Sequence, residues 1–269
     1  MVSPPSEGIE VEARTRTGDD ATNVYEVLRR KILNGDLEPG LRVAQATLAE
    51  LVGVGRTPLR EALRMLQQEG LVLAVRNKGI RISPIDLEEL DCIYGFRVAM
   101  EATAARISIP MMSSRDHQDL AETMAQMQPA IEKGDRDAYE QPHRRFHMLL
   151  MNHVQPTAQR RIEADSDRAE RYRRLLMQGD RNALAIADQE HREIVQACQD
   201  RDGELAAALV ANHLARAAFH VAVQLDPTFN PVMTRTALTM VLGPDRAQSA
   251  ERRAGLGLRT DGPIAKETN

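Results

Sequence analysis

The N-terminal part of the fold is decided by residues 53–70, which read GVGRTPLREALRMLQQEG. Pro58 has no backbone N–H and is tolerated only in the first turn of a helix, so a helix begins within a residue or two of Arg56. Gly70 ends this helix. The apolar residues that recur at helical spacing along it are Leu59, Ala62, Leu63 and Leu66. These residues predict a helix with one buried face.

A row of arginines occupies another face of the same helix, at Arg56, Arg60 and Arg64. Such a row is usually a solvated surface. Here, however, two predicted helices precede it, over residues 23–34 and 45–52, and a tight turn separates the second of them from the arginines. The pattern therefore predicts a helix-turn-helix whose last helix is exposed and cationic.

A hairpin is predicted directly after this helix. Apolar runs at residues 71–75 and 80–82 flank a turn that contains Arg76, Lys78 and Gly79. Three helices and a basic hairpin form a winged helix-turn-helix. The major groove of double-stranded DNA accepts one helix, arginine forks read guanine, and a wing contacts phosphate or the minor groove. We therefore expect operator DNA as a partner.

Composition limits the remaining possibilities. The chain has 269 residues, of which 42% are hydrophobic and 28% charged, so a fibrous or wholly disordered protein is excluded. Aromatic residues amount to 3%, which argues against β-sandwiches and against nucleic-acid binding by base stacking. No apolar run approaches the roughly 18 residues of a membrane span. With no apolar N-terminal signal either, we expect the chain to stay in the cytoplasm and away from membranes.

Four segments are expected along the chain. Residues 1–20 are a disordered tail, 21–84 the winged helix-turn-helix, 85–225 a helical domain, and 226–269 a mostly loose C-terminal tail with one short helix. Residues 21–84 contain ten Lys and Arg against six Asp and Glu, so they carry +4, whereas the whole chain carries -4. The fold class is mainly α, with an all-helical antiparallel bundle of six or seven helices behind the DNA-binding domain. Six helices are predicted in the bundle, at about 86–109, 114–133, 137–152, 157–178, 182–200 and 203–224.

Histidines make the bundle chemically specific. His143 and His147 stand one turn apart on one helix face, while His191 and His213 lie on the apolar faces of two other helices. One such histidine is usually an ordinary core residue, but four that converge are better explained as a metal site. Neutral imidazoles favour Zn²⁺ or Ni²⁺, since Ca²⁺ and Mg²⁺ prefer oxygen ligands.

The same residues do not predict an enzyme. The sequence HRRFH at 143–147 lacks the glutamate that zinc peptidases use as a general base, and no phosphate loop or nucleophile elbow is present. A divalent ion with four neutral ligands can instead hold a small carboxylate effector. Two alternatives remain: a metal-free pocket in which the histidines contact an organic ligand, and a metal-dependent hydrolase fused to a DNA-binding module.

Residues 32–83 closely resemble the DNA-binding domain of the GntR family of bacterial transcription regulators, above all over residues 53–63. The resemblance implies three operator-reading residues and a glycine at the wing tip: Arg56, Thr57, Arg60 and Gly79. Two positions depart from the family pattern. Ala46 stands where some members have a DNA-contacting arginine, and Gly55 replaces the common serine before Arg56.

The second domain, from about Asp86 to Leu225, resembles the FadR-like (FCD) effector domain. The positions that carry the resemblance are Arg97 with Glu101, Phe146 with His147, His191 and His213. It implies that the last three histidines are ligands, that Arg97 faces the effector, and that a fourth ligand, commonly aspartate, stands at His143. Because Pro142 is expected to bend this helix, Glu140 is the alternative ligand. The expected protein is a ligand-responsive transcription regulator that binds a pseudo-palindromic operator as a homodimer.

Overall fold

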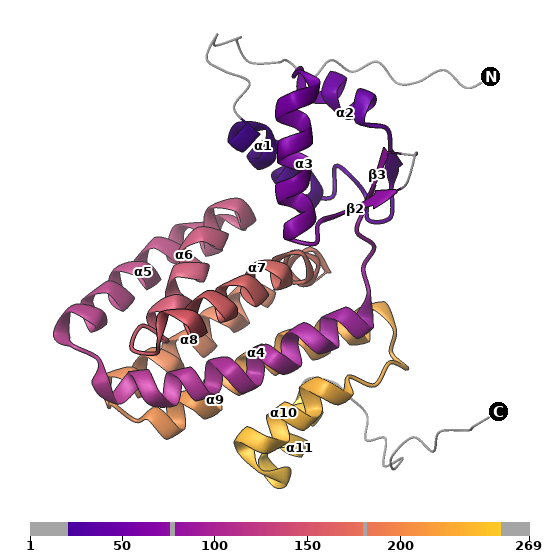
Figure 1. Cartoon of the computed structure of the whole chain (residues 1–269). Helices are drawn as coiled ribbons and strands as arrows, with labels where there is room; N and C mark the ends of the chain where they lie inside the picture. The colour runs from indigo at the N-terminus through magenta and orange to yellow at the C-terminus, as the bar shows by residue number, and fades with distance from the viewer. Residues whose placement is uncertain (1–20, 76–78, 180–181, 254–269) are drawn as a thin grey trace.

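The computed structural model describes residues 21–75, 79–179 and 182–253, and it has two parts. A small N-terminal unit sits on one side of a helical bundle, and the long helix α4 runs along that bundle (Figure 1). The segment predicted as a tail, 1–20, and the predicted DNA-contacting residues Arg76 and Lys78 lie outside the described residues.

The N-terminal unit is a winged helix-turn-helix. Its elements are α1 (Ala21–Leu33), β1 (Arg42–Val43), α2 (Gln45–Val52), α3 (Arg56–Gln68), β2 (Val72–Val75) and β3 (Gly79–Ile82). The three strands form an antiparallel sheet in the order β1-β3-β2, with Val72 opposite Ile82 and Val43 opposite Ile80. Strand β1 was not predicted, because two residues are too short to show an alternating pattern.

Local signals place the helices of this unit where the sequence predicts them. Gly53 ends α2 in a left-handed conformation, and α3 begins at Arg56, two residues before Pro58. Gly55 precedes α3 without a side-chain cap. The apolar face of α3 is buried in a separate small core together with α1 and the sheet. The arginine face is thereby left outward.

The second part is an all-helical bundle. Its elements are α4 (Leu87–Ser108), the 3-10 turn η1 (Ile109–Met111), α5 (Ser114–Lys133), α6 (Arg136–Leu149), α7 (Pro156–Gly179), α8 (Ala183–Gln199), α9 (Gly203–Leu225), α10 (Val232–Leu242) and α11 (Pro244–Arg253). Helices α4 to α9 are the six predicted for residues 85–225, and the described part of the chain adds α10 and α11 to them. Helix α4 is central, since it packs against α7, α9 and α10. The side chain of Asp86 caps its first turn, at the position where the sequence predicts that this helix begins.

The C-terminal segment differs from the expected loose tail. Helix α10 is the one short helix predicted there, whereas α11 was not predicted, and Leu238 and Ala247 of these helices belong to the bundle core. The Asp91 carboxylate on α4 accepts hydrogen bonds from the backbone N–H groups of Met233 and Thr234, both at 2.8 Å. A carboxylate from a distant part of the sequence thus caps α10. The residues next to α10 in the sequence do not predict this cap.

Helix α9 is long and apolar enough to cross a membrane by length and composition. In the bundle, however, 67% of its apolar window is buried. Burial of this extent is typical of a core helix, and buried residues along α9 belong to the core around α4.

We predict that Asp91→Ala lowers the free energy of unfolding by about 1–2 kcal/mol, because two backbone donors of α10 lose their acceptor. Urea denaturation of the full chain measures this change. The exposed substitution Gln126→Ala on α5 is the control and is expected to stay within about 0.5 kcal/mol of wild type. A similarly small effect of Asp91→Ala would show that the carboxylate does not hold α10.

Candidate metal centre and DNA-binding surface

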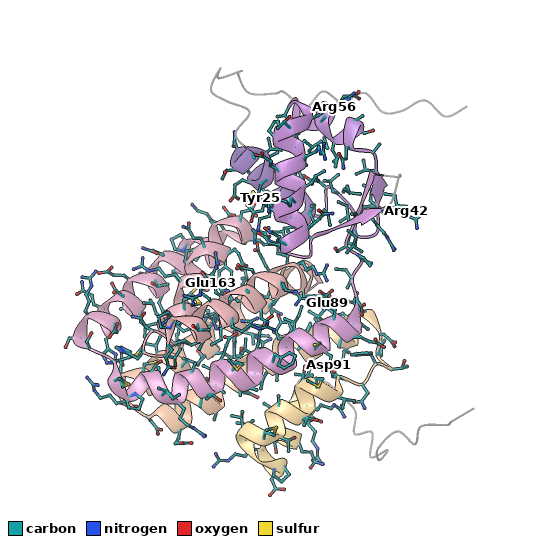
Figure 2. All side chains as sticks on the ribbon, viewed as in Figure 1. Tyr25, Arg42, Arg56, Glu89, Asp91 and Glu163 are labelled. Carbon is teal, nitrogen blue, oxygen red and sulfur yellow. The ribbon has the colours of Figure 1, made fainter. Side chains whose placement is uncertain are left out.

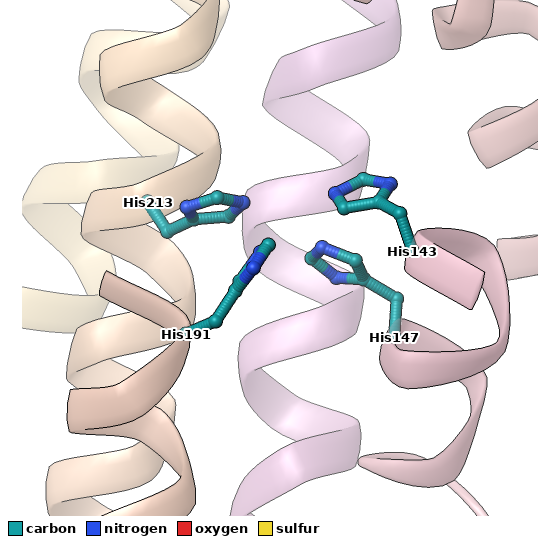
Figure 3. A group of neighbouring side chains, drawn as sticks. All are labelled: His143, His147, His191 and His213. Carbon is teal, nitrogen blue, oxygen red and sulfur yellow. The ribbon is translucent and has the colours of Figure 1, made fainter. Parts of the chain in front are cut away.

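Four histidines from three helices meet in the interior of the bundle. His143 and His147 come from α6, His191 from α8 and His213 from α9, and all four are buried (Figure 3). One ring nitrogen of each lies within 4.8 Å of those of the other three. The ring centroids of His191 and His213 are 4.7 Å apart, and those of His143 and His147 are also 4.7 Å apart.

Pro142 does not turn His143 away from this cluster. Helix α6 continues through the proline, which costs it one backbone hydrogen bond, and His143 stays on the inner face one turn from His147. Glu140, the alternative ligand, pairs instead with the Arg173 guanidinium of α7. The structure therefore brings His143, and not Glu140, to the other three histidines.

Carboxylates support two of the imidazoles from outside. Glu101 Oε2 lies 3.2 Å from His147 Nδ1, and Glu190 Oε2 lies 2.7 Å from His213 Nδ1. Arg216 Nε in turn donates to Glu190 Oε1 at 2.5 Å. Contacts of this kind at Nδ1 are the usual support of histidine ligands in metal sites, because they leave Nε2 free to bind an ion.

Neither Glu190 nor Arg216 was predicted as part of this support. Glu190 precedes His191 on α8 but reaches across to His213 on α9, so only the packing of the two helices brings them together. Burial alone would raise the pKa of the Glu190 carboxyl, but His213 and Arg216 outweigh burial and lower the pKa to about 2. The carboxylate is therefore ionised at neutral pH.

The cluster is suited to neutral imidazoles that face a cation. Burial lowers the pKa of His143 and His191 well below the usual value and that of His147 to about 4. Both ring nitrogens of His191 and Nδ1 of His143 have no hydrogen-bond partner among the described residues. A divalent transition metal with Zn–N bonds of about 2.0–2.1 Å matches this donor set. The residues present therefore fit the metal that the sequence predicts.

A second polar group lies beside the cluster. Arg97 is buried on α4, and its Nε donates to Glu101 Oε1 at 2.6 Å, while neither of its Nη atoms has a partner in the described chain. Tyr94 lies against it, with the Arg97 guanidinium carbon 5.3 Å from the ring centroid. Tyr139 stacks on His143 at a centroid distance of 5.0 Å. Glu101 thus links Arg97, the predicted effector residue, to His147, one of the predicted metal ligands.

The predicted DNA-reading residues lie on the exposed face of α3. Arg56, Thr57, Arg60 and Arg64 are all exposed. Arg56 stands at the end of the winged helix that points away from the bundle (Figure 2). None of the three arginines forms an ion pair within residues 21–75, 79–179 and 182–253, so their charge is available to a polyanion.

Gly79 has a backbone reason to be glycine. Its φ is +87°, and a Cβ atom there would run into the carbonyl group of Val43 in β1. It pairs with Val75 across the hairpin. Gly79 therefore permits the close packing of the wing on β1, and its placement at a DNA contact stays a prediction.

Helix α7 joins the bundle to the winged helix. Arg29 of α1 donates to Glu69 at the end of α3, at 3.0 Å, and also to Glu170 of α7. Arg174 of α7 donates to Asn34 at 2.5 Å. These contacts are between charged and polar side chains, and interfaces rich in such pairs permit one domain to move relative to the other.

The same helix reaches the element that carries two of the histidines. Arg174 Nη1 donates to Asp137 Oδ1 at 2.6 Å, and Asp137 lies in the first turn of α6. The next residue toward the N-terminus, Arg173, pairs with Glu140, also on α6. Helix α7 therefore contacts both the winged helix and the α6 segment that precedes His143.

Family models match both parts of the chain. Residues 20–82 match the gntR family of bacterial regulatory proteins, and residues 92–216 match the FCD domain. The Bacillus subtilis HTH-type transcriptional regulator YdhC is 29% identical over 191 residues, which cover 70% of this chain and 85% of YdhC. An HTH-type transcriptional regulator from the TAR-I ttuE-ttuC' intergenic region of Agrobacterium vitis is 32% identical over 134 residues, 47% of this chain and 76% of that protein.

Solved structures agree with the fold. The E. coli protein McbR/YncC superposes with a TM-score of 0.64 at 22% identity, covering 77% of this chain and 98% of that chain. A transcriptional regulator from Rhodococcus gives a TM-score of 0.63 at 20% identity, over 75% of this chain and 96% of its own. These likenesses confirm the predicted combination of a winged helix with an all-helical domain.

We predict that the chelator-treated protein loses stability as the pH falls from 7 to 5. The histidines have an ordinary pKa near 6.5 when unfolded and a lowered pKa when folded, so in this window the unfolded chain binds more protons and is favoured. At pH 5, each buried histidine lowers the free energy of unfolding by about 2 kcal/mol. Urea denaturation at both pH values measures the loss.

A control variant separates the cluster from other titrating groups. His117→Gln changes a partly exposed histidine on α5 and is expected to keep the full pH dependence. His143→Gln is expected to reduce it. An unfolding midpoint that is the same at pH 7 and pH 5 in the wild-type chain would contradict the buried neutral histidines.

Proposed function

Because the chain belongs to the GntR family of bacterial transcription regulators and carries an FCD domain, we propose that it binds a pseudo-palindromic operator as a homodimer and responds to a small organic acid held at a histidine-bound metal. The observation that carries this proposal is the convergence of four buried histidines in the domain behind the DNA reader. His143, His147, His191 and His213 hold a Zn²⁺ or Ni²⁺ ion. When bound, the ion supplies a positive anchor with open positions for a carboxylate.

The winged helix supplies the DNA contacts. Arg56, Thr57 and Arg60 lie near the N-terminus of α3, the end of a recognition helix that reaches base edges in the major groove. Arg64 lies one turn further along, where phosphate is the partner. The hairpin brings a second set of contacts to the backbone or minor groove through Arg76, Lys78 and Gly79.

An apolar stripe on α4 supports the homodimer. Phe96, Met100 and Ile107 lie on one face of this helix and are 46%, 38% and 48% exposed, and Met111 continues the stripe at 58%. Exposed apolar rows of this length are typical of protein interfaces. A second copy of the chain placed on this stripe by a two-fold axis presents two recognition helices to two half-sites.

The contacts of α7 give the effector a route to the winged helix. An effector that shifts α6 or α7 also shifts Arg174 and Glu170, which hold Asn34 and Arg29 of the DNA-binding domain. Regulation requires only that the effector bind more tightly to one arrangement of the two domains.

For DNA reading, we predict that Arg56→Ala and Arg60→Ala each reduce discrimination between operator and random duplex by about 1–3 kcal/mol, because a bidentate base contact is lost. The operator is obtained by in vitro selection from a randomised duplex pool, and affinities are measured by fluorescence anisotropy at fixed salt. Arg115→Ala, an exposed arginine on α5, is the matched control. Unchanged selectivity in both α3 variants would show that another surface reads the DNA.

For assembly, we predict that sedimentation finds a species of about twice 30.0 kDa. Phe96→Asp and Ile107→Asp bury a charge in the interface and raise the dimer dissociation constant about tenfold or more. Met240→Asp, on α10 and 80% exposed, is the control and leaves the dimer intact. A monomeric wild-type chain, or α4 variants that dimerise normally, would show that this stripe is not the dimer interface.

For the metal, we predict about one equivalent of zinc or nickel in gently purified protein, measured by elemental analysis. His147→Ala and His191→Ala each lower metal affinity by a factor on the order of 10–100 or more, since a ligand is lost. His117→Ala keeps the metal. A wild-type protein without transition metal would favour the metal-free pocket in which histidines contact the effector directly.

A further inference from the structure

Unpaired polar atoms gather beside the histidine cluster. The buried atoms of this group that find no hydrogen-bond partner in the described chain are Tyr94 Oη, Arg97 Nη1 and Nη2, Glu101 Oε2, Tyr139 Oη, Glu140 Oε2 and Arg173 Nε. Native interiors leave few polar groups unpaired, because each costs about 1–3 kcal/mol. This concentration on α4, α6 and α7 indicates a polar partner that binds there.

Contacts join this group into one region. Arg97 lies over the ring of Tyr94, and Tyr139 stacks on His143. Arg173 pairs with Glu140, which stands three residues before His143 on the same helix. The region therefore runs from the histidines to α7, with Arg97 on α4 and Arg173 on α7.

The hydrogen-bonding balance of the region favours a partner rich in acceptors. The unpaired arginine nitrogens and two phenols can donate, whereas the unpaired carboxylate oxygens of the region are Glu101 Oε2 and Glu140 Oε2. Carboxylate oxygens accept several hydrogen bonds, and they are the ordinary partners of arginine.

The charges of the region indicate how many carboxylates the partner carries. Each arginine near the cluster already has a carboxylate partner: Arg97 with Glu101, Arg173 with Glu140, and Arg216 with Glu190. The four imidazole ligands are neutral when they bind a metal. The divalent ion therefore adds two positive charges that no described side chain in this region offsets, and a single carboxylate cancels only one of them.

We propose that the effector is a small dicarboxylate, whose first carboxylate binds the metal and Arg97 and whose second binds Arg173 and Tyr94. This inference rests on the proposed function and adds to it a second anion subsite on α7. Arg173 stands next to Arg174, which contacts Asn34 of the winged helix. The second carboxylate thus meets the helix that touches the DNA-binding domain.

Calorimetry on the full-length, metal-loaded protein tests this subsite with acids matched in carbon number: malonate against propionate, succinate against butyrate, and glutarate against valerate. We expect at least one diacid to bind about tenfold or more tightly than its monoacid, because two more charge-assisted hydrogen bonds form. The Arg173→Gln, Glu140→Gln double variant replaces the buried ion pair by neutral amides of similar size. It is expected to abolish the diacid preference while retaining metal content and monoacid binding.

Two further variants complete the test. Tyr94→Phe keeps the ring and removes the hydroxyl, and we expect it to reduce the diacid preference severalfold. Arg192→Gln, an exposed arginine on α8, is the control and leaves the preference unchanged. The inference is overturned if monoacids bind as tightly as diacids, if the double variant keeps the preference, or if no diacid binds to protein with stoichiometric metal. Failure of the proposed function gives a different result, because elemental analysis then finds no metal in the wild-type protein.

Discussion

The bundle is built around a buried polar cluster that its own side chains do not satisfy. Four neutral imidazoles lie in a core of alanine, leucine and phenylalanine, and ring nitrogens of His143 and His191 face no partner in the described chain. Burying such groups unpaired is costly, whereas a shared cation turns them into ligands. The histidines of helices α6, α8 and α9 meet at this point. The packing of these helices therefore also creates the candidate metal site.

Helix α7 connects this cluster to the winged helix. Arg173 on this helix pairs with Glu140 of α6, the helix of His143, and the next residue, Arg174, contacts Asn34, which follows α1 of the winged helix. Ionic and polar contacts join the two domains, and pairs of this kind add little free energy each when they are partly exposed. A ligand that favours one arrangement can therefore redistribute the domains with ordinary binding energy.

Much of the fold follows from local signals, and the rest from contacts between distant residues. Pro58, Gly53 and Asp86 place helix ends because caps and φ angles are set within a few residues. The histidine set is predictable since periodicity alone puts each one on an apolar face. The ordering of α10 by Asp91 and the pairing of Arg173 with Glu140 depend on partners far away in the sequence. Position 143 shows the limit: Pro142 predicts a bend, whereas α6 continues through it and His143 lies in the cluster.

X-ray absorption at the K-edge of the metal that copurifies with the full chain tests the central claim most directly. Our account predicts a first shell of imidazole nitrogens at about 2.0–2.1 Å, close to four in number, with any remaining position taken by oxygen. A first shell without imidazole, or a folded protein that takes up no divalent transition metal, would contradict it.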